Sequence, residues 1–161
     1  MKCKALYFSA AVCFLAVVGM VLSLALTGGK SASAEFTLPP FETAAQRGMP
    51  DAPDKSWTQI YREGMHFSAH ICGRVVLDGN AAEVYFTNND GNEVWLKLRI
   101  LDEKNHILAE TGLLKPNEYV RTVTFDTVPE NRANIKIKIM AYEPDTYYSA
   151  GAVTLNTTVG G

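Results

Sequence analysis

Apolar and polar residues alternate without interruption from Glu93 to Ile100, the most regular stretch of the chain. One parity is wholly aliphatic and the other holds the charges and the indole: Val94, Leu96, Leu98 and Ile100 against Glu93, Trp95, Lys97 and Arg99. This period of two predicts a half-buried β-strand. The stretch from Ile135 to Tyr142 repeats it, with Lys136 and Lys138 between isoleucines. We therefore expect two central strands, each with an aliphatic face and a basic face.

Shorter alternating stretches separated by turn residues predict further strands on both sides of this pair. Residues 57–62 favour a short helix or a first edge strand, and residues 65–77 favour an edge strand. Residues 82–87 are expected to form a β-hairpin with the Glu93 strand through the turn Asn88 to Asn92. Later strands are expected near 107–110, 119–125, 135–142 and 149–159, with a leucine-ordered loop at 111–118. The spacing indicates an all-β fold, an antiparallel β-sandwich of immunoglobulin or fibronectin III type.

The N-terminus has a different pattern, because Lys2 and Lys4 precede an uncharged run at 5–26. As a helix this run would extend roughly 30 Å, enough to span a bilayer with the following residues outside the cytoplasm. Residues 1–27 are therefore expected to be a signal peptide or a membrane anchor. Both remain open, since cleavage after Ala34 would release a secreted domain. The proline-punctuated residues 28–56 are expected to be a flexible stalk, and residues 57–161 the β-sandwich domain.

Charge and cysteine content narrow the possible functions only slightly. The formal net charge of −2 gives no global attraction to nucleic acid, so contact with a polyanion would require a local patch. Cys3 and Cys13 lie in or beside the apolar run, which leaves Cys72 alone in the expected domain. The domain is therefore expected to fold on its apolar core, with no internal disulfide.

The segment Thr111-Gly112-Leu113-Leu114-Lys115-Pro116-Asn117-Glu118, together with the N-terminal span and the closing strand, carries a resemblance. It resembles small, N-terminally anchored, exported single-domain proteins of Gram-positive bacteria. Members typically have a Ser/Thr-Gly-Leu-x-x-Pro-Gly-x loop, and many lie near mobile-element or surface-protein genes without an established biochemical role. This chain has Asn117 where that loop usually has glycine. The resemblance implies an extracytoplasmic β-sandwich and no particular activity.

Three groups of residues suggest chemistry, and each also has a structural explanation. His66, His70 and Cys72 share one strand parity and are ligand types for zinc or copper, but residues four apart on a strand lie about 13 Å apart. Asn88 to Glu93 offers oxygen ligands for calcium, although a hairpin turn explains it better. Asn156-Thr157-Thr158 matches a glycosylation acceptor and also suits a polar strand end. No motif predicts catalysis or a cofactor, so we expect a protein that is not an enzyme.

The basic face of the two central strands is the predicted binding surface. If the two strands are antiparallel neighbours, Lys97 and Arg99 lie beside Lys136 and Lys138, and Trp95 approaches Met140 and Tyr142. The expected binding residues are Trp95, Lys97, Arg99, Lys136, Lys138 and Tyr142. The leading hypothesis is a cell-surface binding module or accessory subunit whose partner is an acidic protein or an anionic wall polymer. Metal binding through His66, His70 and Cys72, or a structural subunit that assembles by strand pairing, are the alternatives.

Overall fold

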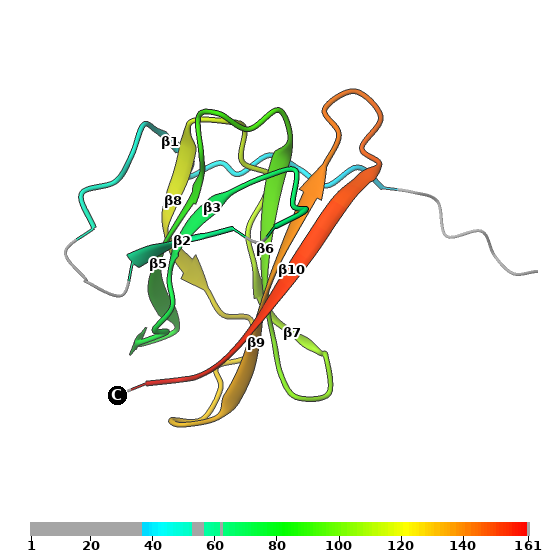
Figure 1. The fold of residues 1–161 in the computed structure, drawn as a ribbon. Helices are drawn as coiled ribbons and strands as arrows, with labels where there is room; N and C mark the ends of the chain where they lie inside the picture. Colours follow the sequence, from blue (N-terminus) through cyan, green and yellow to red (C-terminus); the bar gives the residue numbers. More distant parts are fainter. Residues whose placement is uncertain (1–36, 53–56, 62, 161) are drawn as a thin grey trace, which may run out of the picture. The chain divides into compact units, whose positions relative to one another are not determined.

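The computed structural model describes residues 37–52, 57–61 and 63–160 (Figure 1). The chain divides into two compact units, Met1–Thr37 and Leu38–Gly161. The described residues of the second unit form ten strands and no helix. The strands are β1 Gln46–Arg47, β2 Trp57–Ile60, β3 Ala69–Cys72, β4 Leu77–Asp78, β5 Ala81–Asn88, β6 Trp95–Leu101, β7 Ile107–Glu110, β8 Glu118–Thr124, β9 Asn134–Tyr142 and β10 Ser149–Thr158.

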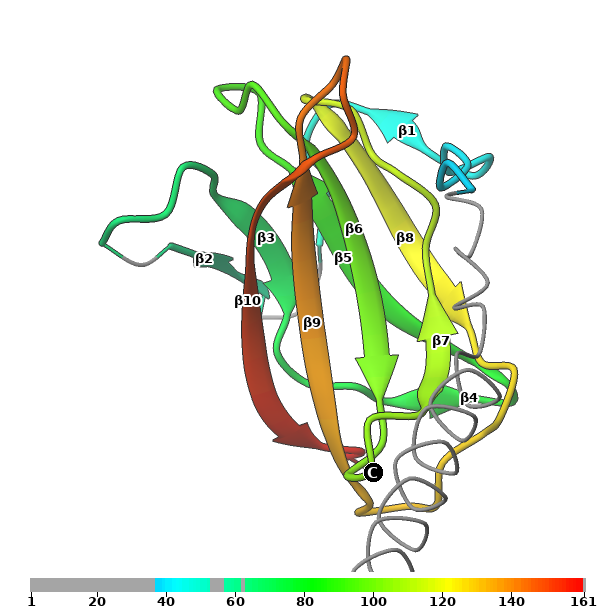
Figure 2. The ribbon, with the colours of Figure 1, turned by 90° about the vertical axis from the view of Figure 1, so that its right-hand side faces the viewer.

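These strands form two antiparallel sheets, which confirms the all-β class predicted from sequence. One sheet has the order β1-β8-β5-β3-β2, with β4 also paired to β5, and the other has the order β10-β9-β6-β7. Figure 2 looks onto the second sheet, with the first sheet behind it. The aliphatic parities of β6 and β9 point between the sheets, and their side chains are almost completely buried: Leu96, Leu98, Ile100, Ile135, Ile137 and Ile139.

The predicted hairpin between residues 82–87 and the Glu93 strand is wrong, because β5 and β6 belong to different sheets. The turn between them carries the chain from one sheet to the other. The side chain of Asn88 is fully buried at this crossing and donates to the carbonyls of Val94 and Leu114, both at 2.9 Å. Asn92 donates to the Asn88 side-chain oxygen at 2.5 Å and to the Ser68 carbonyl at 2.6 Å. Side-chain amides therefore replace the ladder hydrogen bonds that a hairpin would have made.

Residues 65–77 do not form one edge strand, so that prediction is also wrong. The strand β3 is short and interior, with β2 on one side and β5 on the other. The outermost position belongs to β2, which agrees with the edge-strand alternative for residues 57–62. After Cys72 the chain leaves the ladder, and Val75 forms a parallel bridge to Val159 beyond the end of β10. The Gly160 amide donates to the Val75 carbonyl at 2.9 Å, which links the two sheets at this end.

The expected stalk at 28–56 is wrong for the residues that follow Leu38, which pack on the domain. Phe41 forms a parallel bridge to Leu113, and β1 pairs with β8. The Glu42 carboxylate also accepts a hydrogen bond from the Gly112 amide at 2.8 Å. Proline disrupts strand pairing only where its missing backbone N–H would have to donate a hydrogen bond. Here Pro40 uses its carbonyl, which accepts a hydrogen bond from the Leu113 amide at 2.9 Å. Residues 28–36 and 53–56 lie outside the described residues.

The loop at 111–118 is ordered by Leu113 and Leu114, as predicted, since both side chains are fully buried. Asn117 in this loop has a φ of 62°, in the left-handed region. Asparagine is one of the residues that adopts this conformation most readily after glycine. This conformation accounts for the asparagine at this position of the loop.

The expected N-terminal helix at 5–26 and the cleavage site after Ala34 also lie outside the described residues. Within the part of the chain that the structure describes, there is no helix long and apolar enough to cross a membrane.

A substitution at Gly112 tests the packing of the N-terminal segment. A Cβ atom at this position would overlap the backbone of Phe41 and Glu42, so Gly112→Ala must displace the segment that holds Phe41 and β1. We expect a loss of about 1 to 3 kcal/mol in the free energy of unfolding, measured by urea denaturation. The matched control is Gly91→Ala, because its Cβ would meet no atom within 4 Å. Equal stability of the two variants would contradict the close approach.

Candidate binding face

The outward face of the β10-β9-β6-β7 sheet brings the predicted binding residues together. Trp95 lies opposite Tyr142, and Arg99 lies opposite Lys138, so the register expected between the two central strands is confirmed. Lys97 lies opposite Met140, one pair away from Lys138 on the same face. Lys136 follows toward the far end of β9, opposite Leu101. All six predicted residues therefore share one face, which is the one turned to the viewer in Figure 2.

Lys97 is not exposed, which corrects the prediction of an open basic surface. Its side chain is only 5% exposed, and its ammonium group lies 2.9 Å from Glu110 Oε1 on β7. Arg99 Nε lies 2.7 Å from the other oxygen of the same carboxylate. The sequence predicts an exposed Lys97 because an unpaired charge in the interior costs several kcal/mol. The carboxylate of Glu110 supplies the missing partner, so Lys97 can be covered by its neighbours.

The two cations also change the acidity of Glu110. Partial burial by itself would raise the pKa of this carboxyl, but the hydrogen bonds and positive charges of Lys97 and Arg99 outweigh it. The pKa of Glu110 is therefore held below its ordinary value. At neutral pH the carboxylate is charged and bridges both cations.

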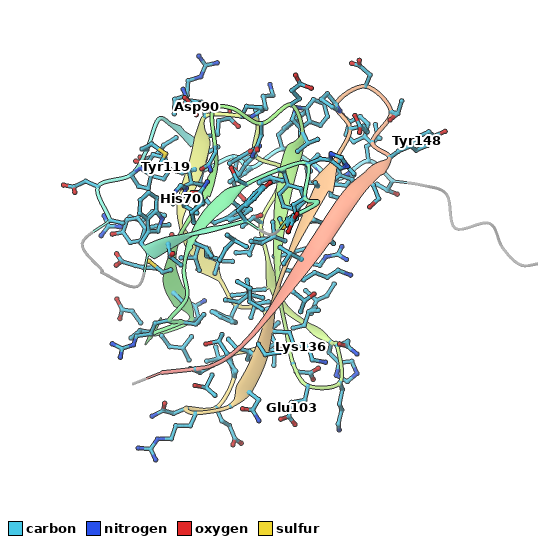
Figure 3. The ribbon with its side chains drawn as sticks, viewed as in Figure 1. His70, Asp90, Glu103, Tyr119, Lys136 and Tyr148 are labelled. Atoms are coloured by element: carbon cyan, nitrogen blue, oxygen red, sulfur yellow. The ribbon has the colours of Figure 1, made fainter. Side chains whose placement is uncertain are left out.

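Lys136 and Lys138 have no carboxylate partner among the described residues, and they differ from each other. The Lys136 ammonium donates to the Glu103 carbonyl at 3.0 Å and to Asn105 Oδ1 at 2.8 Å, so neutral oxygens hold it (Figure 3). Lys138 makes no hydrogen bond or ion pair within the described part of the chain. Lys138 is thus the cation of this face that is available to an incoming anion.

An aromatic cluster lies at one end of the face, around Trp95. The Trp95 ring makes edge contacts with Phe41 at 4.8 Å and with Tyr147 at 5.1 Å between ring centroids. Lys115 lies over the Phe41 ring, with its ammonium 4.7 Å from the centroid. Sequence reasoning missed Phe41 and Tyr147, because they lie in segments without periodicity. The available signal was that each is an aromatic residue near a proline.

The candidate metal ligands are not gathered into a site. His66 is exposed ahead of β3, and Cys72 is buried within the sheet. The His70 ring stacks on Trp57 at 4.5 Å, and its Nδ1 lies 2.7 Å from Asn89 Oδ1 (Figure 3). Among the described residues there is no group of three or more His, Cys, Asp or Glu side chains able to hold a metal ion.

The candidate calcium turn and the glycosylation triplet have different surroundings. The Asn88 and Asn92 amides bind protein groups at the crossing between the sheets, and Asn89 donates to Ser68 Oγ at 2.6 Å. The side chains of this turn therefore stabilise the passage from β5 to β6. Asn156 lies exposed in β10, directly opposite Lys136.

A second feature, on the outer face of the other sheet, was not predicted. Tyr85 interrupts β5 with a φ of 43°, at the point where its register with β8 shifts. A cavity of about 500 Å³ opens beside it, lined in part by Tyr85, Glu83 and Arg74. Arg121 binds Glu83 through two nitrogens at 2.6 and 2.9 Å and lies over the Tyr85 ring. Burial, reinforced by the Glu83 charge, raises the pKa of Tyr85.

Comparisons of this chain with protein-family models, with curated proteins and with solved structures found no match.

The Glu110 bridge predicts a pH-dependent loss of stability. Glu110→Gln removes the charge that compensates buried Lys97, and we expect it to cost about 1 to 2 kcal/mol in the free energy of unfolding at pH 7. The folded-state pKa is depressed, so the contribution of this carboxylate is present above its unfolded pKa and disappears as pH falls through the folded value. The difference between wild type and variant should therefore shrink below about pH 4.

Urea denaturation across pH provides the measurement, with Glu130→Gln on an exposed loop as the control. A difference that stays constant between neutral and acid pH would show that the charge of Glu110 is not what stabilises the bridge.

Proposed function

We propose that this protein is a non-enzymatic, extracytoplasmic binding module of immunoglobulin or fibronectin III type that docks an acidic partner protein. The docking surface is the outward face of the β10-β9-β6-β7 sheet, centred on Lys138, Arg99 and Trp95. The extracytoplasmic location rests on the N-terminal sequence pattern at 1–34, and the lack of catalysis rests on the absence of a catalytic motif in the sequence.

Strand order supports the immunoglobulin or fibronectin III assignment. In such sandwiches strands A, B and E form one sheet, while G, F and C form the other, which can be extended by C′. The orders β3-β5-β8 and β10-β9-β6-β7 follow this arrangement in chain order. Three strands are additional, since β2 lies outside β3, β1 lies outside β8, and β4 pairs with β5. The tryptophan also differs, because antibody domains bury one on strand C, whereas Trp95 on β6 lies on the outward face.

The imbalance of charge on this face is the observation that carries the proposal. The outward positions of the described strands β6, β7, β9 and β10 hold four cations, Lys97, Arg99, Lys136 and Lys138, and one carboxylate, that of Glu110. Glu110 is shared by Lys97 and Arg99, which leaves Lys138 without an acceptor among the described residues. The whole chain is slightly acidic, so this local excess of positive charge can attract an anionic partner that the rest of the protein would not.

The aromatic end of the face favours a protein over a simple polyanion. Phe41 is 37% exposed, and Trp95 and Tyr142 are half-buried beside it on the same end of the sheet. Protein interfaces are enriched in aromatic residues and arginine, surrounded by polar groups. A polyanion such as a wall polymer would use the cations alone, so its binding should not depend on Trp95. The metal-binding alternative finds no support in the described geometry, because His70 is engaged by Trp57 and Asn89.

Reversing the charge of Lys138 tests the docking surface. Lys138→Glu should weaken capture of the native surface partner about fivefold and flatten its salt dependence, because it removes the available cation. The matched control is Lys104→Glu, which changes the net charge equally on an exposed loop outside the sheet. Affinity is measured by surface plasmon resonance at two ionic strengths.

Trp95→Ala in the same assay separates the two kinds of partner. Loss of binding in this variant indicates a protein interface, and unchanged binding indicates an anionic polymer. If Lys138→Glu and Lys104→Glu bind alike, the docking role of this face is excluded.

A further inference from the structure

The two sheets differ in width, and the difference leaves one strand only partly covered. The strand β2 lies outside β3 in one sheet, whereas the other sheet ends at β10. Figure 2 shows the β2–β3 hairpin reaching past β10 in the layer behind it. Register places Thr58 opposite Ile71 and Ile60 opposite Ala69, so these side chains of β2 point to the inner side of the sheet.

Burial shows that the described structure covers this inner side of β2 only in part, since Ile60 packs against the edge of the core. Ile71 and Ala69 on β3 are completely buried, as expected for the inner face of a sandwich. Ile60 is only half-buried, and Thr58 is exposed. Neighbouring strands of a sheet lie about 4.8 Å apart. One further strand beside β10 would therefore lie over the inner side of β2.

The edge of β10 suits strand addition better than the other edges of the domain. It spans Ser149–Thr158, and the sequence from Ser149 to Gly161 holds no charged residue and no proline. Natural edge strands are usually protected by charge, proline, bulges or short length. The other outermost strands are short: β1 has 2 residues, while β2 and β7 have 4 each. The register shift of β10 lies near its start, at Ser149 and Gly151, and the pairing with β9 is regular beyond it.

We propose that the acidic partner binds through one extended strand added to the edge of β10, with alternating apolar and acidic residues, while the rest of the partner meets Arg99 and Trp95 on β6. This inference rests on the proposed function and names the form that its partner takes. Apolar side chains of the added strand cover Thr58 and Ile60 and meet Leu155, which is half-buried on the inner side of β10. Backbone groups on the outer edge of β10 ahead of Thr157 supply the hydrogen bonds, since Gly73 and Val75 already hold Thr157 and Val159.

The charges beside β10 determine which residues the added strand carries on its outward face. Thr154 lies directly opposite Lys138, and Asn156 lies directly opposite Lys136. An outward residue of the added strand lies about 5 Å from Thr154 and about 10 Å from the Lys138 backbone, a gap that the long lysine stem spans. A carboxylate at this position meets the cation that lacks an acceptor within the described chain.

A second copy of this chain fits the edge less well. Pairing β10 with its own copy would bring the copy's β3 beneath the added strand, where β2 of the first molecule already lies. It would also add cations next to a face that is already basic. The partly covered inner side of β2 therefore matches a lone strand, and a second copy becomes an outcome of the test.

A synthetic peptide of alternating valine and glutamate, capped at both ends, serves as the probe with the full-length protein in neutral detergent. The peptide should slow amide hydrogen exchange in β10, and its affinity should fall about fivefold in Lys138→Glu.

Thr58→Arg should abolish binding, because the arginine side chain would fill the space over the inner side of β2. Gln59→Arg lies on the opposite face of β2 and should leave binding unchanged. A peptide with N-methyl groups on alternate amides keeps its charges and loses the ladder hydrogen bonds, so it should not bind.

Each alternative gives a different result. Equal binding of the methylated peptide, with a continued dependence on Lys138, would overturn strand addition and leave the acidic docking face standing. No binding of the unmethylated peptide by wild type, together with native-partner capture that is insensitive to Lys138→Glu, would overturn both. Protection of β10 without peptide, with a dimer in light scattering, would overturn the lone strand and identify a second copy of the chain as the occupant.

Discussion

The amide of Asn88 is the polar contact on which the packing of the two sheets depends. It is completely buried where the chain passes from β5 toward β6, and it bonds the carbonyls of Val94 and Leu114. Val94 directly precedes β6, and Leu114 lies in the loop at 111–118. One side chain therefore joins the end of β5 to the start of β6 and to this loop. Buried amides that lose a partner cost about 1 to 3 kcal/mol each. The position thus specifies where β5 ends and fixes the register with which β6 enters the second sheet.

The elements predicted correctly from sequence are strands in which the alternation of apolar and polar residues already shows which side chains are buried. Strands β6 and β9 alternate without a break, and the sequence alone distinguishes the aliphatic parity of each. The turn at Asn88 predicts a hairpin because Asn and Gly favour a reversal locally, whether the next strand pairs with the last one or joins the facing sheet. Only the tertiary partners, Val94 and Leu114, distinguish the two cases.

The candidate face was predicted in position and mispredicted in exposure. Parity placed Lys97 on the outward side, and that is correct, but exposure depends on Glu110, a residue of β7 that no periodic signal connects to Lys97. The same applies to Phe41, which comes from a proline-flanked segment and reaches Trp95 only because Gly112 has no side chain to block the approach. Contacts between distant segments therefore account for most of what the sequence left undetermined at this face.

The entry of the chain into the domain beside Trp95 has a mechanical consequence. Phe41 contacts the Trp95 ring, and its backbone joins Leu113 through a parallel bridge. Tension applied through the residues that precede Leu38 reaches this bridge and the Phe41 ring before it reaches the strands of either sheet. The proposed binding face and the entry of the chain therefore share Phe41, so a force on the preceding residues is applied at the border of that face.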